Sequence, residues 1–218
     1  MYYITSDLHF DHKNIIKYCN RPYPFDWDGV KQMNEDIFKQ FDELPSGSTI
    51  INLGDIALSG VLTFEKLKGF VDRMKQNDKK LWIILGNHDR EMPFRVKDFK
   101  GKFNSPYDLF IAAGFDRVFP FPIILGDKIL SHEPIYLKPG SNLINYFGHV
   151  HDTDIDINYF NRDCENWAMM ERVKAEAITQ QTNLDIDTSI KLYGKEIDLN
   201  NYYNVCWDKH YKILPFEW

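Results

Sequence analysis

Short apolar runs alternate with longer segments of helical periodicity through the first half of the chain. Residues 2–6, 50–53 and 81–85 have the length and the β-branched and aromatic content of buried strands. Two segments between these runs carry apolar residues at helical spacing, namely Val30, Met33, Ile37, Phe41 and Leu44 in the first and Phe64, Leu67, Val71 and Met74 in the second. Each segment offers one apolar stripe to a neighbour. The alternation predicts an α/β fold in which helices pack on a sheet.

After residue 119, turn-forming residues separate shorter apolar stretches. The pair Gly126-Asp127 lies between two of these stretches and predicts a β-hairpin whose turn is this pair. Residues 143–147 predict a further strand. Residues 202–207 and 211–214 predict a closing hairpin near the end of the chain.

Length and composition indicate a single globular domain. The 218 residues are too few for two domains of ordinary size, and 44% hydrophobic with 27% charged residues is typical of a soluble protein. The formal charge of −6 argues against a broad basic surface for duplex nucleic acid. A metal site could still bind a single phosphate group.

The cysteines and the apolar runs indicate where in the cell the protein is expected to lie. Cys19, Cys164 and Cys206 are far apart and form no C-x-x-C pair, so we expect reduced thiols. The first residues lack the basic and apolar pattern of a signal peptide, and no apolar run approaches the ~18 residues that span a bilayer. We therefore expect a cytoplasmic protein with no membrane contact.

Six of the seven histidines have Gly, Asp or Asn close by and lie near the ends of predicted strands. They occur in the segments Asp7-Leu8-His9, Asp11-His12, Gly86-Asn87-His88-Asp89, Ser131-His132-Glu133 and Gly148-His149-Val150-His151. Gly54-Asp55 closes the second strand in the same way. Ligands of open α/β sheets bind beyond the carboxyl ends of parallel strands. We therefore expect these segments to form one site.

The spacing of these residues suits a metal ion. In an extended chain, successive side chains point to opposite faces, which would put Asp7 and His9 on the same face. A carboxylate and an imidazole could then bind the same ion. A glycine ahead of Asp55, Asn87 and His149 would let the backbone turn sharply and approach an ion closely. Imidazole and oxygen donors together suit manganese, iron, zinc or nickel, and the thiolates of structural zinc sites are missing from this set.

The ordered blocks D-x-H, G-D, G-N-H-D, H and G-H-x-H resemble those of the calcineurin-like metallophosphoesterases, and all five are present between Asp7 and His151. The strings Phe10-Asp11-His12-Lys13-Asn14-Ile15-Ile16 and Cys19-Asn20-Arg21-Pro22 resemble the small stand-alone members of bacteria and phages. The resemblance implies a four-layer α/β/β/α sandwich, with two mixed sheets face to face and helices outside.

Residues 152–200 have no counterpart that we expect in compact members of this family. Within them, residues 163–181 predict a helix with Trp167, Met170 and Val173 on one side. This helix would pack on the core or on a second subunit, or would form a substrate lid. We expect a single domain over residues 1–218, with an insertion or cap-like segment at about 152–200.

The resemblance also implies a centre of two divalent metal ions, with manganese as the first expectation and iron, zinc or nickel as alternatives. One ion would be bound by Asp7, His9, Asp55 and His151, and the other by Asp55, Asn87, His132 and His149. Asp55 would bridge the ions, and a hydroxide shared between them would attack phosphorus. His88 would donate a proton to the leaving oxygen, and Asp89 would orient His88 through its other ring nitrogen.

Several of these residues have a second interpretation. Asn87 could cap a helix, and Asp89 could be a turn carboxylate. His12 could reach the phosphate or the leaving group, or could cap the helix that follows it. Arg21 and Arg90 could bind phosphate, because guanidinium groups match phosphate oxygens, or could be ordinary surface arginines.

We expect a metal-dependent phosphoesterase that prefers phosphodiesters to phosphomonoesters. A nucleotide, a short nucleic acid or a phosphoprotein could be the substrate, and a homodimer is possible. The alternative is a catalytically silent metal-binding scaffold of the same fold that recruits protein partners. Loss of His88 or of a ligand would favour the scaffold, and neither loss occurs. A metal site kept for stability alone would carry no acid beside the ions. His210 is assigned no role.

Overall fold

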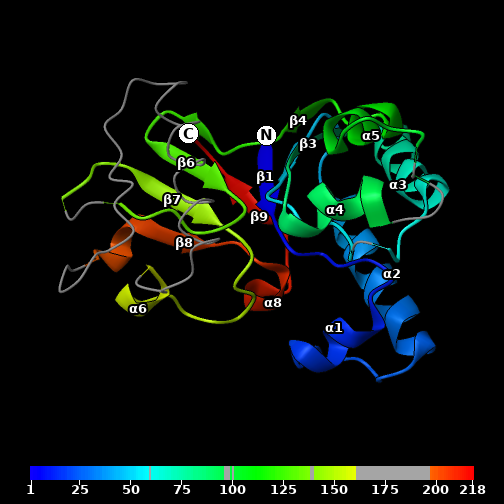
Figure 1. Ribbon diagram of the computed structural model, residues 1–218, viewed down its shortest axis with the longest axis horizontal. Helices are drawn as coiled ribbons and strands as arrows, with labels where there is room; N and C mark the ends of the chain where they lie inside the picture. The colour runs from blue at the N-terminus through cyan, green and yellow to red at the C-terminus, as the bar shows by residue number, and fades with distance from the viewer. Residues whose placement is uncertain (59, 96–98, 100, 138–139, 161–196) are drawn as a thin grey trace.

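The computed structural model describes residues 1–58, 60–95, 99, 101–137, 140–160 and 197–218. Within these ranges, a five-stranded and a four-stranded β-sheet face each other, and helices cover the outer side of the first sheet (Figure 1). A short helix, α6 (Ile157–Phe160), packs on Phe147 and Tyr202 of the second sheet. Both sheets contain parallel and antiparallel pairs, so the predicted sandwich of two mixed sheets flanked by helices is confirmed.

The five-stranded sheet is parallel except at one edge. Its strands, in spatial order, are β4 (Arg117–Phe119), β3 (Lys80–Ile84), β2 (Thr49–Asn52), β1 (Tyr2–Thr5) and β9 (Leu214–Phe216). β1 to β4 are parallel, and β9 runs antiparallel to β1. The strands predicted at residues 2–6, 50–53 and 81–85 are β1, β2 and β3. Because these three are parallel, their carboxyl ends lie at the same edge of the sheet.

Helices connect these strands and cover one face of the sheet. They are α1 (Lys13–Tyr18), α2 (Trp27–Glu43), α3 (Phe64–Gln76), α4 (Asn87–Arg95) and α5 (Pro106–Ala113). The side chains of Asp26, Thr63 and Ser105 cap α2, α3 and α5, because each accepts a hydrogen bond from a backbone N–H in the first turn. The predicted apolar stripes of α2 and α3 both belong to the core on this face.

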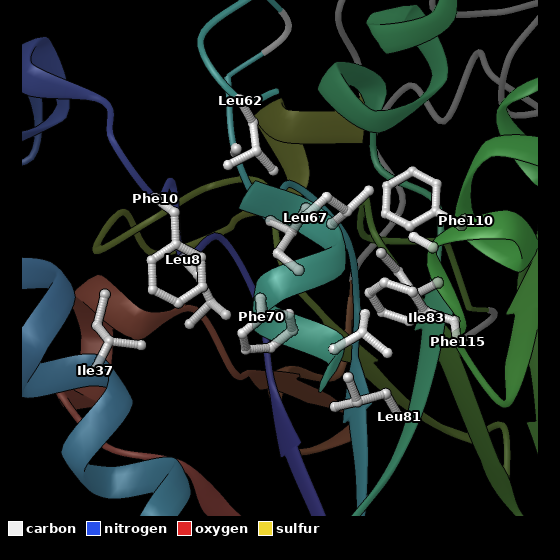
Figure 2. Close-up of a cluster of buried hydrophobic side chains, with 14 of the residues drawn as sticks. Leu8, Phe10, Ile37, Leu62, Leu67, Phe70, Leu81, Ile83, Phe110 and Phe115 are labelled. Carbon is white, nitrogen blue, oxygen red and sulfur yellow. The ribbon is translucent and has the colours of Figure 1, made fainter. Parts of the chain in front are cut away.

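Apolar side chains fill both sides of the five-stranded sheet, because neighbouring residues of a strand point to opposite faces. Ile83 packs with Leu67 of α3 and Phe110 of α5 on the helical side (Figure 2). Ile84 packs between the two sheets with Leu130 of the second sheet. Burial on both faces explains why these strands read as continuous apolar runs in the sequence.

The second sheet places a further set of strand ends beside the first. Its strands, in spatial order, are β5 (Ile123–Leu125), β6 (Lys128–Ser131), β7 (Ile144–Phe147) and β8 (Tyr202–Asn204). β5 and β6 form the predicted hairpin, and Gly126 in its turn has a φ of 61°. β6, β7 and β8 are parallel, so their carboxyl ends also lie at one edge.

The predicted closing hairpin is wrong, because its two strands belong to different sheets. β8 pairs with β7, whereas β9 pairs with β1. Between them, the short helix α8 (Trp207–His210) carries the chain from one sheet to the other, and Trp207 N–H donates to Ser6 O at 2.9 Å. Two short apolar runs around a polar turn specify strands, but they do not specify the partner of each strand.

The helix predicted at residues 163–181, with Cys164, lies outside the described residues. So does most of segment 152–200, of which the structure describes residues 152–160, α6 included, and residues 197–200. The interpretation of this segment as an insertion or cap stays a prediction. In the part of the chain that the structure describes, no helix has both the length and the apolar composition needed to cross a lipid bilayer.

Leu67→Ala should lower the free energy of unfolding by roughly 2 to 5 kcal/mol, because the fully buried side chain would leave a cavity. Urea denaturation measures the difference. Lys68→Ala, on the exposed side of the same helix, is the control and should change the free energy by less than about 0.5 kcal/mol. Equal losses in the two variants would contradict this placement of the core.

Candidate metal centre

The predicted site residues follow the carboxyl ends of five parallel strands, drawn from both sheets. Asp7, Asp55 and Asn87 follow β1, β2 and β3, and His132 and His149 follow β6 and β7. Backbone hydrogen bonds tie the loops of each sheet together: Asp7 N–H donates to Gly54 O at 3.0 Å, and Gly148 N–H donates to His132 O at 2.7 Å. Across the two sheets, the backbone N–H of His149 donates to Oδ2 of Asp7 at 2.8 Å. The loops therefore form one surface along the edge between the sheets.

The donor atoms of these residues gather in two groups. The ligand atoms of Asp7, His9 and His151 lie within 4.8 Å of one another. Those of Asp55, His132 and His149 form a second such group. Each group contains three of the four residues expected for one ion, and their role as metal ligands stays a prediction.

Asp55 lies between the groups and contacts members of both. Its Oδ2 is 3.4 Å from Nε2 of His132 and 3.9 Å from Nε2 of His9. Burial by itself would raise the pKa of Asp55, but the charge of His132 and its hydrogen bond to Asp55 outweigh burial and hold the pKa well below the usual value. One buried, ionised carboxylate is therefore shared by the two groups.

Asn87 completes the second group with an amide oxygen. Its Oδ1 lies 2.9 Å from Nε2 of His132 and 3.1 Å from Nδ1 of His149. His132 is held from its other side, where Nδ1 lies 2.8 Å from the backbone oxygen of Leu53. An oxygen and two ring nitrogens thus converge within this group.

The polar atoms of the first group fit a metal ion. Asp7 Oδ1 and His9 Nε2 are buried, and neither has a hydrogen-bond partner among the described residues. Buried polar atoms are nearly always paired, so these two atoms suit a ligand that accepts their lone pairs. Burial lowers the pKa of His9 well below its usual value and that of His149 to about 4. Neutral imidazole is the form that binds metals.

A family model described as the calcineurin-like phosphoesterase matches residues 2–205. The chain belongs to this family. The predicted resemblance is confirmed, and membership implies metal-dependent hydrolysis of phosphate esters.

Individual relatives say less about activity. An uncharacterized protein of Methanocaldococcus jannaschii is 36% identical over 101 residues, which are 45% of this chain and 53% of that protein, so the match spans about half of the relative. A protein of unknown function from Aquifex aeolicus has a TM-score of 0.51 and 20% identity, covering 98% of this chain and 94% of that chain. It supports the fold. A Pseudomonas putida nuclease has 20% identity and a TM-score of 0.43, covering 69% of this chain and 61% of that chain.

The loops that carry the predicted ligands are not extended. Asp7, His9, Asp55, His149 and His151 all have left-handed backbones, with φ between 52° and 70°. Asp7 and His9 do lie together, but the predicted reason, alternating side chains along an extended chain, is wrong. Residues other than glycine adopt this conformation at a cost of about 1 to 3 kcal/mol each, and it is concentrated at functional sites.

The glycines beside the ligands allow one loop to approach another. A Cβ on Gly86 would lie 2.6 Å from the backbone nitrogen of Asp55 and closer still to its Oδ1. A Cβ on Gly148 would collide with Ser6 and Asp7. Neither Gly86 nor Gly148 has a positive φ, so the expected sharp turn is not the reason for glycine there. Close contact between loops is the reason.

Asp89 does not orient His88 as predicted. Its Oδ2 accepts from the backbone N–H of Asp55 at 2.7 Å and of Gly86 at 2.9 Å, and its Oδ1 accepts from Ile56 N–H at 3.2 Å. His88 Nδ1 has no hydrogen-bond partner among the described residues. Burial and the charge of Asp55 raise the pKa of Asp89 to about 7. Asp89 therefore joins two ligand loops through their backbones.

His88, His12 and Arg90 surround the two groups. Nε2 of His88 is 3.9 Å from Oδ2 of Asp55, and 28% of its side chain is exposed. His12 is buried, with Nδ1 3.3 Å from Nδ1 of His9, and its side chain makes no capping hydrogen bond to α1. Arg90 is half-buried, and burial lowers its pKa, while the charges of Asp89 and Asp55 oppose this shift.

Arg21 is an interior residue and not a phosphate clamp. Its side chain is only 3% exposed. The guanidinium donates to the carboxylate of Asp208 and to the backbone oxygens of Asp7 and Leu8. The prediction that it binds phosphate is wrong, because these internal acceptors hold its N–H groups.

Two residues near the ligands escaped the sequence analysis. Cys206 Sγ donates to Oδ2 of Asp7 at 3.1 Å, and the backbone N–H of His149 donates to the same oxygen at 2.8 Å. Asp208 Oδ2 lies 2.6 Å from Nδ1 of His151. Cys206 and Asp208 belong to no motif and lie more than fifty residues after His151, so only the return of the chain through α8 brings them to the site.

Gly86→Ala should weaken metal binding and destabilise the fold, because the added methyl group would displace Asp55. Gly69→Ala is the matched control. Gly69 lies on the exposed side of α3 with open space around it, so alanine there should raise the free energy of unfolding by about 0.5 to 1 kcal/mol. Metal titration and denaturation of both variants test the prediction, which fails if Gly86→Ala binds metal as the wild type does.

Proposed function

We propose that this chain hydrolyses phosphodiesters with two divalent ions bound at the candidate centre. The ligands would be Asp7, His9, Asp55, Asn87, His132, His149 and His151. The observation that carries the proposal is that two donor groups meet at the single buried carboxylate of Asp55. Imidazole, carboxylate and amide oxygen donors together suit manganese, iron, zinc or nickel, and manganese is the metal that we test first.

Two such ions, when bound, supply an activated water and neutralise charge on the phosphoryl group. Burial lowers the pKa values of His9 and His149, and Asp55 is ionised, so these three donors are in the form that binds metal. Despite burial, the pKa values of His132 and His151 are raised by the carboxylates beside them, so each of these rings would release a proton on binding. His88 acts as the acid. Its ring lies beside Asp55 and is partly exposed, so Nε2 can reach the leaving oxygen of a bound ester and donate a proton to it.

The small amount of positive charge from side chains around the centre favours a diester. Arg21 is already neutralised by Asp208, so it offers nothing to a substrate. His12 and Arg90 then provide the remaining contacts to the phosphate among the predicted residues. A phosphodiester carries one negative charge and needs less compensation than the dianion of a phosphomonoester.

An exposed aromatic ring beside the centre favours a nucleotide or a short nucleic acid. Tyr18, on α1, is 71% exposed, and its ring centroid lies 6.3 Å from that of His12. His12 in turn contacts His9. A base attached to the bound phosphate could stack on Tyr18, since every base offers a π face.

Metal-stripped protein resupplied with manganese should hydrolyse bis-p-nitrophenyl phosphate faster than p-nitrophenyl phosphate. His88→Ala should lower kcat by roughly 10² to 10⁴ for a dinucleotide, whose alkoxide leaving group needs a proton, because the change removes the proton donor and no proposed ligand. The p-nitrophenyl esters should lose less, because p-nitrophenolate leaves without a proton. Initial rates and bound metal are measured together.

His210→Ala is the control for that experiment. His210 bonds to the backbone oxygen of Asn204 and has no part in the proposed chemistry, so its loss should leave kcat unchanged. If the wild type binds manganese but cleaves neither ester, the silent scaffold becomes the better explanation.

Tyr18→Leu should raise KM for the p-nitrophenyl ester of thymidine 5′-phosphate by about fivefold or more, because a stacked base contributes about 1 to 3 kcal/mol. KM for methyl p-nitrophenyl phosphate, which has no base, should stay the same. Tyr107→Leu, an exposed tyrosine on α5, serves as the control. Equal changes for both esters would rule out stacking on Tyr18.

A further inference from the structure

The carboxylate of Asp208 is buried between a proposed ligand and an arginine. Asp208 lies on α8 and is 4% exposed. Its Oδ2 lies 2.6 Å from Nδ1 of His151 and accepts from Nη2 of Arg21 at 3.0 Å. Its Oδ1 accepts from Nε of Arg21 at 2.6 Å. Asp208 lies outside residues 2–205, to which the family model extends.

Arg21 joins this carboxylate to the loop after β1. Its Nη2 also donates to the backbone oxygen of Asp7 at 2.8 Å, and its Nη1 donates to that of Leu8 at 2.9 Å. Asp7 and His151 belong to the same donor group. The buried guanidinium of Arg21 therefore connects the backbone of Asp7 to the carboxylate of Asp208, which contacts His151.

We propose that the Arg21–Asp208 pair positions His151 as a ligand of the first ion. This role depends on the metal centre proposed above. A carboxylate bonded to one ring nitrogen fixes the tautomer and the orientation of the imidazole, and it leaves the other nitrogen for the ion. The pair is rigid, because a buried charge that lost its partner would be strongly destabilised. Asp208 is thus a positioning residue supplied by the C-terminal part of the chain.

An alternative role for Asp208 is that of a metal ligand itself. Its carboxylate, the thiol of Cys19 and the ring of His151 also lie within 4.8 Å of one another. Both oxygens of Asp208, however, already take hydrogen bonds from Arg21, and one of them also contacts His151. The cation beside this carboxylate is the guanidinium of Arg21, which argues against an ion there.

Asp208→Asn should weaken the binding of one of two manganese ions by roughly 10- to 100-fold, as losses of such supporting carboxylates do. Equilibrium dialysis at a manganese concentration that just saturates the wild type should then leave one ion per chain. Because asparagine leaves Arg21 unpaired in the interior, the double variant Arg21→Met/Asp208→Asn is tested beside it. The double variant removes the unpaired charge of Arg21 and should also retain one ion.

Leu67→Ala is the control for general destabilisation, since it lies in the helical core and should keep two ions while its unfolding temperature falls. Two ions bound with wild-type affinity by folded Asp208→Asn or by the folded double variant would overturn the positioning role. A wild-type protein that binds no manganese, iron, zinc or nickel would overturn the proposed function itself, and the two failures are therefore distinct.

Discussion

The buried carboxylate of Asp55 is the interaction on which the site depends. Its side chain accepts from the backbone N–H of His88 at 2.9 Å, and its own backbone N–H donates to Asp89. Its backbone oxygen accepts from His9 N–H at 3.2 Å. The loops after β1, β2 and β3 are thus joined through one residue. A charge buried this deeply needs compensation, and the surrounding imidazoles provide part of it.

The geometry of the loops is strained, and the sandwich beneath them maintains it. Five proposed ligands have left-handed backbones, which the rest of the fold must stabilise at about 1 to 3 kcal/mol each. Parallel strands with both faces buried provide rigid starting points for these loops. Asp89 and the close approach at Gly86 then fix the loops against each other. Rigidity in the strands and strain in the loops together hold the donors in place.

The C-terminal part of the chain connects the two sheets and supports the donors from behind. It leaves the second sheet at β8, passes through α8 and joins the first sheet as β9. On the way it brings Cys206 to Asp7 and Asp208 to His151. This crossing makes the site a product of both sheets, and it explains why residues outside the motif blocks contact the proposed ligands.

The sequence by itself determined the early strands, the stripes of α2 and α3, the hairpin at Gly126-Asp127 and the family, because these depend on local periodicity and on short ordered motifs. Only the tertiary structure decided the partners of β8 and β9, the burial of Arg21 and the role of Asp89. Each of these depends on groups distant in the chain: Arg21 and Asp208 are separated by 187 residues, and Asp89 and Asp55 by 34. Local pattern specifies an element or a residue type, whereas the partner of a polar group depends on which chain segments fold against each other.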